Sequence, residues 1–98
     1  MIKQTPVKGS KKVKVNFVLP KDSAAGKVSV VGDFNGWDPM SNPLRKRSNG
    51  TRSTAVELDP GDHPFRYLAE SAGFFDEPDA DRIEPNGYGD THSVLSVG

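Results

Sequence analysis

Apolar and polar residues alternate along much of this chain, with the period of two that is typical of half-buried β-strands. In the first alternating run, residues 12–19, the apolar positions are Val13, Val15, Phe17 and Leu19. A second run, residues 28–31, is rich in valine and stops at Gly32. Alternation returns at residues 54–58 and 64–70, and residues 92–97 form a closing run with Val94 and Leu95 as its apolar centre. No stretch keeps the 3.6-residue period of a helix.

Turn signals separate these runs. Asn49-Gly50 is the strongest hairpin signal in the chain, and residues 59–62 have the order Asp-Pro-Gly-Asp of a tight turn. Residues 76–89 contain further turn signals. The spacing predicts about seven short strands packed as an all-β, immunoglobulin-like β-sandwich. We expect one domain over residues 12–98, preceded by a flexible lead-in over residues 1–11.

The composition agrees with a small, turn-rich domain. The chain has 98 residues, with 10 glycines, 8 prolines and no cysteine. A disulfide framework and a thiolate metal site are therefore excluded. No apolar run reaches the roughly 18 residues of a membrane span, and the first ten residues lack the apolar region of a signal peptide. A cytoplasmic protein without a membrane partner is expected.

The formal net charge is zero, from 13 basic and 13 acidic residues, but the two signs are unevenly distributed. We interpret them as two solvated ends that attract each other. Nucleic acid is not an expected partner, because the early lysines alternate with valines and no aromatic residues lie between them. The basic cluster is Lys3, Lys8, Lys11, Lys12 and Lys14; the acidic cluster is Asp76, Glu77, Asp79, Asp81, Glu84 and Asp90.

The residue patterns of common enzymes are missing from the sequence, and no enzymatic activity is expected. There is no nucleophile elbow, P-loop or zinc-protease motif. His63 and His92 are interpreted as surface histidines. Asp79 and Asp81 begin like a calcium loop, but the third acid and its glycine are missing, so neither a metal nor another cofactor is predicted.

Trp37 is the only tryptophan, and it follows the turn dipeptide Asn35-Gly36 at the end of the valine-rich run. A large aromatic residue there is either a core plug or a platform for stacking. Flat aromatic rings match the apolar C–H faces of pyranose sugars. Arg66 would add hydrogen-bond donors, and Phe74 or the adjacent Phe75 a second ring; of these two, one is expected to face inward and one outward.

Four motifs in order resemble those of one family. Residues 32–37 read Gly-Asp-Phe-Asn-Gly-Trp, and residues 64–68 place Arg66 among aromatic residues. Residues 78–89 and the closing run 93–97 resemble two further motifs. Together they resemble the glycogen-binding, isoamylase N-terminal type of carbohydrate-binding module, family 48. This module precedes the catalytic barrel in α-glucan branching and debranching enzymes, and a related version occurs in the beta subunit of the AMP-activated protein kinase.

The resemblance implies a set of site residues. In the glycogen-binding relatives two tryptophans stack on the glucan, helped by a lysine, a hydrophobic residue and an asparagine. By similarity Trp37 takes the first ring position and Arg66 the lysine position. Phe74 replaces the second tryptophan, Tyr88 lies near the hydrophobic position, and His92 replaces the asparagine.

The function implied is that of a stand-alone, non-catalytic module that binds an α-1,4-glucan polymer or oligosaccharide. No catalytic barrel accompanies the module in this sequence, so the family's hydrolase or transferase activity is not carried over. The alternative is a protein-interaction module, with the sugar site lost, that docks on a glucan-metabolising enzyme or another partner through a sheet face or an exposed edge strand.

Overall fold

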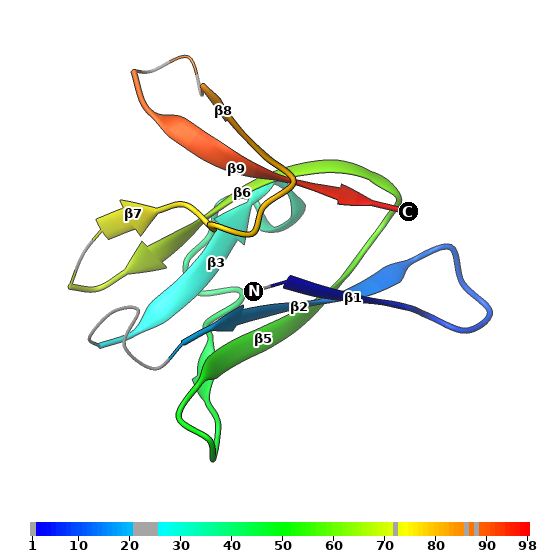
Figure 1. Ribbon diagram of the computed structural model, residues 1–98, viewed down its shortest axis with the longest axis horizontal. Helices are drawn as coiled ribbons and strands as arrows, with labels where there is room; N and C mark the ends of the chain where they lie inside the picture. Colours follow the sequence, from blue (N-terminus) through cyan, green and yellow to red (C-terminus); the bar gives the residue numbers. More distant parts are fainter. Residues whose placement is uncertain (1, 21–25, 72, 86, 88) are drawn as a thin grey trace.

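A computed structural model describes residues 2–20, 26–71, 73–85, 87 and 89–98. Within these ranges the chain forms two antiparallel sheets packed as a β-sandwich, which confirms the predicted all-β fold (Figure 1). None of the described residues lies in a helix long and apolar enough to span a membrane. The elements are β1 (Ile2–Pro6), β2 (Val13–Leu19), β3 (Val28–Gly32), the short 3-10 helix η1 (Asp33–Asn35), β4 (Arg45–Lys46), β5 (Arg52–Leu58), β6 (Gly61–Ala69), β7 (Gly73–Phe75), β8 (Arg82–Pro85) and β9 (Thr91–Val97).

The four-stranded sheet has the order β1-β2-β5-β4, and the second sheet has the order β3-β6-β9-β8 with β7 also paired to β6. The predicted Asn49-Gly50 hairpin joins β4 to β5, and Gly50 has a φ of 89°. The predicted turn at residues 59–62 has a larger role, because it carries the chain from β5 in one layer to β6 in the other (Figure 1).

The core lies between the two layers and is centred on Phe17. Its ring centroid is 5.2 Å from that of Phe65 and 6.5 Å from that of Tyr67. Alternation explains the arrangement, since every second residue of a strand points to the same face. The buried apolar residues of this cluster are Val15, Phe17, Leu19, Val28, Val30, Leu44, Leu58, Phe65, Tyr67, Ala69, Leu95 and Val97.

Two edge strands are not predicted by the alternation. The sequence predicts only a lead-in over residues 1–11, whereas Ile2–Pro6 forms β1 and pairs with β2 along its full length. Arg82–Pro85, within a segment expected to contain only turns, forms β8 and pairs with β9. Both strands are mostly exposed, so backbone hydrogen bonds to a neighbour, not burial of an apolar face, place them in the sheets.

β3 is buried on both faces, which accounts for valine at the adjacent positions 30 and 31. After η1 the chain returns antiparallel to β3 as far as Leu44, whose N–H donates to the Val28 carbonyl at 2.8 Å. Midway, the Ser29 hydroxyl donates to the Pro39 carbonyl at 2.7 Å. Val31, which is on the outward face of β3, is also fully buried.

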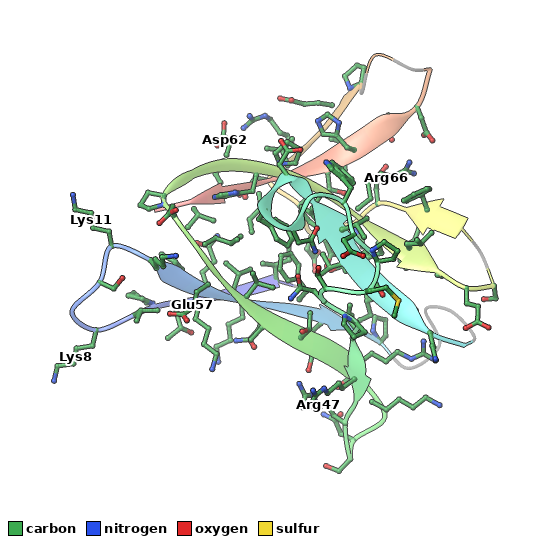
Figure 2. The ribbon with its side chains drawn as sticks, turned by 180° about the vertical axis from the view of Figure 1, so that it is seen from behind. Lys8, Lys11, Arg47, Glu57, Asp62 and Arg66 are labelled. Carbon is green, nitrogen blue, oxygen red and sulfur yellow. The ribbon has the colours of Figure 1, made fainter. Side chains whose placement is uncertain are left out.

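The basic cluster and the acidic cluster of the sequence lie in different layers. Lys8 and Lys11 project from the β1–β2 turn, whereas Asp62 and Arg66 belong to the opposite sheet (Figure 2). The expected attraction between the two charged ends does not take the form of direct ion pairs in the described residues. Acids of the five-stranded sheet instead pair with its own arginines, as in the 2.7 Å contact between Arg82 Nη2 and Asp62 Oδ2.

Candidate functional site

The turn after β3 holds Trp37 at the surface. Gly36 and Trp37 both have left-handed backbone conformations, with φ of 67° and 60°. Such a φ is uncommon for a residue other than glycine, so the turn must be held by its surroundings. The Trp37 N–H donates to the Gly32 carbonyl at 2.9 Å, and the Gly32 N–H donates to Asn35 Oδ1 at 3.0 Å. The Asn35 amide also donates to the Val30 carbonyl, so the turn is tied to β3 at several points.

The indole of Trp37 is partly exposed rather than enclosed in the core. The residue is 38% exposed, and its Nε1–H donates to Asp33 Oδ1 at 2.7 Å. None of the described aromatic rings stacks on it. Of the two roles that the sequence left open for Trp37, the structure therefore excludes the core plug; its role in stacking on a ligand stays a prediction.

Arg66 and Phe74 meet on the outer face of the five-stranded sheet. Strand register places Arg66 opposite Val31, and Leu68 between Ser29 and Phe74. The Arg66 guanidinium carbon lies 5.3 Å from the centroid of the Phe74 ring, which is the geometry of a cation–π contact. Phe74 is nevertheless 53% exposed, so about half of its surface remains accessible to a ligand.

The adjacent phenylalanine points the other way. The Phe75 ring centroid is 5.3 Å from that of Tyr67, and Phe75 packs against the core cluster. The prediction that one ring of the pair faces inward and one outward is confirmed, and Phe74 is the outward ring.

Two carboxylates hold the Arg66 side chain. Nη1 donates to Asp90 Oδ2 at 3.1 Å, and Nε lies 3.5 Å from Asp76 Oδ1, too long for a good hydrogen bond. The side chain is only 11% exposed, and no described residue accepts a hydrogen bond from Nη2. Two N–H donors thus stay available on a guanidinium group whose position is fixed.

Arg66 occupies the position at which β6 changes partners. Residues 61–65 of β6 pair with β9, and residues 67–69 pair with β7. Asp90 directly precedes β9 and Asp76 directly follows β7, so the two carboxylates meet at this junction. The N–H of Thr91 and the Arg66 guanidinium both stabilise the charged form of Asp90 and lower the pKa of its carboxyl group below the ordinary value.

A buried polar network lies behind this junction. The Tyr67 hydroxyl donates to Glu77 Oε1 at 2.9 Å, and the Glu77 N–H donates to Ser93 Oγ at 2.9 Å. Ser93 Oγ in turn donates to Asp76 Oδ1 at 3.0 Å, and Thr91 Oγ1 donates to Asp76 Oδ2 at 2.6 Å. Burial and the neighbouring carboxylate raise the pKa of the Tyr67 hydroxyl, which keeps it protonated as a donor. The network fixes the segment that positions Asp76.

The two remaining predicted site residues are His92 and Tyr88. His92 lies next to the Ser93–Phe65 pair, so alternation puts it on the same outer face as Arg66. Its Nε2 is 3.8 Å from Glu84 Oε1 on the neighbouring strand, and its side chain is 18% exposed. Tyr88 lies outside the described residues.

The structure therefore brings Arg66, Phe74 and His92 to one face, with Trp37 on the turn that follows the neighbouring strand. Sequence reasoning missed the acids that hold these groups. Asp33 could have been recognised from its position four residues before Trp37 in a tight turn. No local signal marks Asp76 or Asp90, because only the strand register brings them to Arg66. Among the described residues, no group of three or more histidines and acids is placed to hold a metal.

The comparisons with known proteins give one short similarity. No family model matches the chain. A stretch of 26 residues, 26% of the chain, is 62% identical to the 1,4-alpha-glucan branching enzyme GlgB 2 of Xanthomonas campestris pv. campestris strain 8004. The enzyme of the same name from strain ATCC 33913 matches to the same extent. The matched stretch covers 4% of the length of these relatives.

Proposed function

We propose that this chain is a non-catalytic module that binds α-1,4-glucan on the outer face of its five-stranded sheet. The observation that carries the proposal is the exposed Phe74 ring, which contacts the Arg66 guanidinium on the outer face of the five-stranded sheet. The partly exposed Trp37 indole adds a second flat ring at the end of β3. The short similarity to enzymes named for 1,4-alpha-glucan supports the choice of sugar.

The residues fit the chemistry of a pyranose ring. Its C–H face is apolar and stacks on an aromatic ring, while its hydroxyl groups need donors and acceptors around the rim. Arg66 would supply the donors of Nη2, and the carboxylates that hold it reduce the entropy lost when a sugar binds. His92 can donate or accept at the edge of the same face. The residues named here bind the sugar without transferring any group, so we expect no product from maltooligosaccharides.

The proposal is tested by affinity electrophoresis in gels containing glycogen and by calorimetry with β-cyclodextrin. We expect Trp37→Ala and Phe74→Ala each to weaken binding by about tenfold, since each removes one stacking ring. Ile83→Ala is the matched control, because Ile83 is also an exposed apolar side chain, 47% exposed, but lies on β8. Unretarded migration of the unmodified protein in glycogen would reject the proposal.

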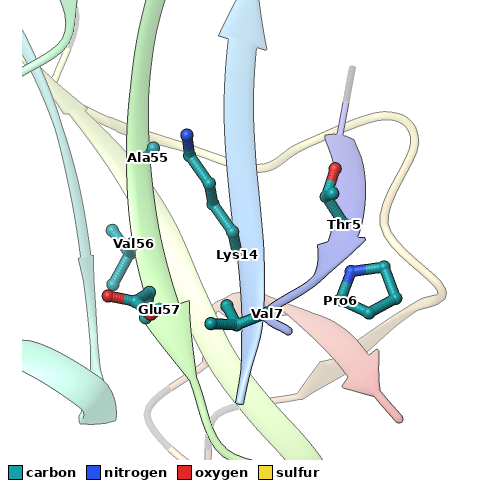
Figure 3. Close-up of a pocket in the computed structure, with 7 residues that line it drawn as sticks. All are labelled: Thr5, Pro6, Val7, Lys14, Ala55, Val56 and Glu57. Atoms are coloured by element: carbon teal, nitrogen blue, oxygen red, sulfur yellow. The ribbon is translucent and has the colours of Figure 1, made fainter. Parts of the chain in front are cut away.

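A second candidate, protein docking, is favoured by the exposed edge of the four-stranded sheet. β1 lies at the end of that sheet, and among the described strands β2 is the one with which it forms a ladder; the Gln4 side chain of β1 also donates to the Ser96 carbonyl of β9. A shallow hollow of about 460 Å³ extends from β1 across β2 to β5 and is lined by Thr5, Pro6, Val7, Lys14, Ala55, Val56 and Glu57 (Figure 3). A strand of a glucan-metabolising enzyme could add to this edge. Titration with a purified 1,4-alpha-glucan branching enzyme tests this; Lys3→Glu on β1 should weaken the complex, and absence of a complex rejects it.

A further inference from the structure

An apolar groove continues the outer face of the five-stranded sheet beyond Phe74. It has a volume of about 480 Å³, within the range of small-molecule sites. Its apolar walls are Val28, Pro39, Met40, Pro43, Leu44 and Leu68. Met40 is 84% exposed, so a large thioether side chain stands in water at the rim with little of its own surface buried. Neither the sequence motifs nor the similarity to branching enzymes assigns a role to this groove.

The groove is formed by the return of the chain along β3. Trp37 is bonded to Gly32 at one end of β3, and Leu44 is bonded to Val28 at the other. Between them the Ser29 hydroxyl holds the Pro39 carbonyl at 2.7 Å, which places Pro39 and Met40 over the Ser29 end of the strand. The same segment thus presents Trp37 at one end and the wall of the groove at the other.

The groove is continuous with the Arg66–Phe74 surface. Ser29, Leu68 and Phe74 form one row across β3, β6 and β7, because Leu68 is opposite Ser29 on one side and opposite Phe74 on the other. Ser29 and Leu68 also line the groove. A chain of sugars that stacks on Phe74 would therefore reach the groove by passing over Leu68.

The chemistry of the groove suits a sugar unit. The apolar walls match a pyranose C–H face, and Lys27 and Glu70 also line the groove, where they supply a charged donor and a charged acceptor for hydroxyl groups. We infer that the groove is a second glucose subsite, which takes further units of the same α-glucan chain that stacks on Phe74. This inference rests on the proposed function and adds to it a preference for longer chains.

The test is calorimetry of the unmodified protein and of Met40→Ala with maltooligosaccharides from maltotriose to maltoheptaose. We expect the affinity of the unmodified protein to rise with chain length. Met40→Ala should weaken binding of maltoheptaose by about fivefold while leaving maltotriose within twofold, because it removes one wall of the groove only. Because Met40 is exposed, Met40→Ala should fold normally. A thermal melt of the variant checks this. Ile83→Ala again serves as the control.

Three results would overturn the inference. If Met40→Ala lost the same affinity for oligosaccharides of every length, Met40 would belong to the same subsite as Phe74. If it lost no affinity at any length, the groove would bind no sugar. A dimer that Met40→Ala dissociates, seen by light scattering after size exclusion, would assign the groove to a second copy of the chain. If the unmodified protein binds no oligosaccharide at all, the proposed function itself fails, which is a different result from binding that Met40→Ala does not alter.

Discussion

Gly32→Ala should destabilise the fold and weaken the site together, and the reason is steric. The φ of Gly32 is −173°, an extended conformation that alanine adopts without cost. A Cβ atom at this position, however, would lie 2.5 Å from the Pro64 carbonyl oxygen, 2.8 Å from Phe34 Cε2 and 3.0 Å from Phe65 Cβ. The Pro64 oxygen and Phe65 Cβ belong to β6, the strand that pairs with β3. Neither atom is the flexible end of a side chain, so the clash cannot be relieved by a change of rotamer.

The size of the effect follows from the contact distances. A carbon and a carbonyl oxygen approach to about 3.3 Å, so the two strands would have to separate locally by about 0.8 Å. Overpacking of this kind costs about 1–3 kcal/mol, and the lower entropy of the unfolded alanine chain offsets about 0.5 kcal/mol of that cost. We expect a net loss of about 2 kcal/mol, equivalent to a fall in Tm of about 10 °C for a domain of this size.

Urea unfolding followed by tryptophan fluorescence measures the loss of stability of Gly32→Ala. Affinity electrophoresis in glycogen measures its weaker binding. Binding should weaken because the Gly32 backbone carries hydrogen bonds from Trp37 and to Asn35 Oδ1, so a displaced Gly32 displaces the turn. Gly9→Ala is the control, because a Cβ atom at Gly9 would have no neighbour within 4 Å, while the φ of 77° still disfavours alanine. It should cost about 1 kcal/mol through backbone strain alone, without any change in binding. A Gly32→Ala protein whose free energy of unfolding stays within about 0.5 kcal/mol of the original would refute the reasoning, since that is the range of a neutral surface change.

Two further predictions concern the polar groups around Arg66. Tyr67→Phe removes a buried donor to Glu77 Oε1 and should lower the free energy of unfolding by about 1–3 kcal/mol; an unchanged urea midpoint would contradict this. The pKa of Asp90 is lowered by the Thr91 N–H and by Arg66, so the ionised carboxylate stabilises the fold above the ordinary pKa and the stabilisation is lost as pH falls through the lowered pKa. Arg66→Met should raise the Asp90 pKa in a carbon-13 NMR titration, and an unmoved pKa would show that the ion pair does not form in solution.

The strands with an apolar face could be predicted from the sequence. The alternation that puts Val15, Phe17 and Leu19 on one side of β2 is a local property, and all three are buried. Phe65, Tyr67 and Ala69 on β6 follow the same rule. β1 and β8 could not be found in this way, because their side chains are mostly exposed and their pairing depends on the backbone of a neighbour.

The site was less predictable, although its rings could be proposed. A local turn marks Trp37, and the requirement that one of two adjacent rings in a strand faces outward marks Phe74. The groove walls gave no such signal, because Met40 and Pro43 lie in an irregular segment whose path is set by bonds to β3. The alternation of apolar and polar residues predicts the face of the sheet on which a side chain lies. It does not predict which distant segment of the chain covers that face.

The partner change of β6 explains why fold and candidate site depend on the same residue. A strand that pairs with β9 over one part and with β7 over the next leaves a junction where neither ladder continues. At that junction Arg66 makes ionic contacts with Asp76, which follows β7, and with Asp90, which precedes β9. The guanidinium thus joins the ends of two strands that are not paired with each other there, and the Phe74 ring beside it is exposed on the outer face. A lysine could not do this as well, because a single ammonium lacks the planar fork needed to contact both acids and still cover the ring.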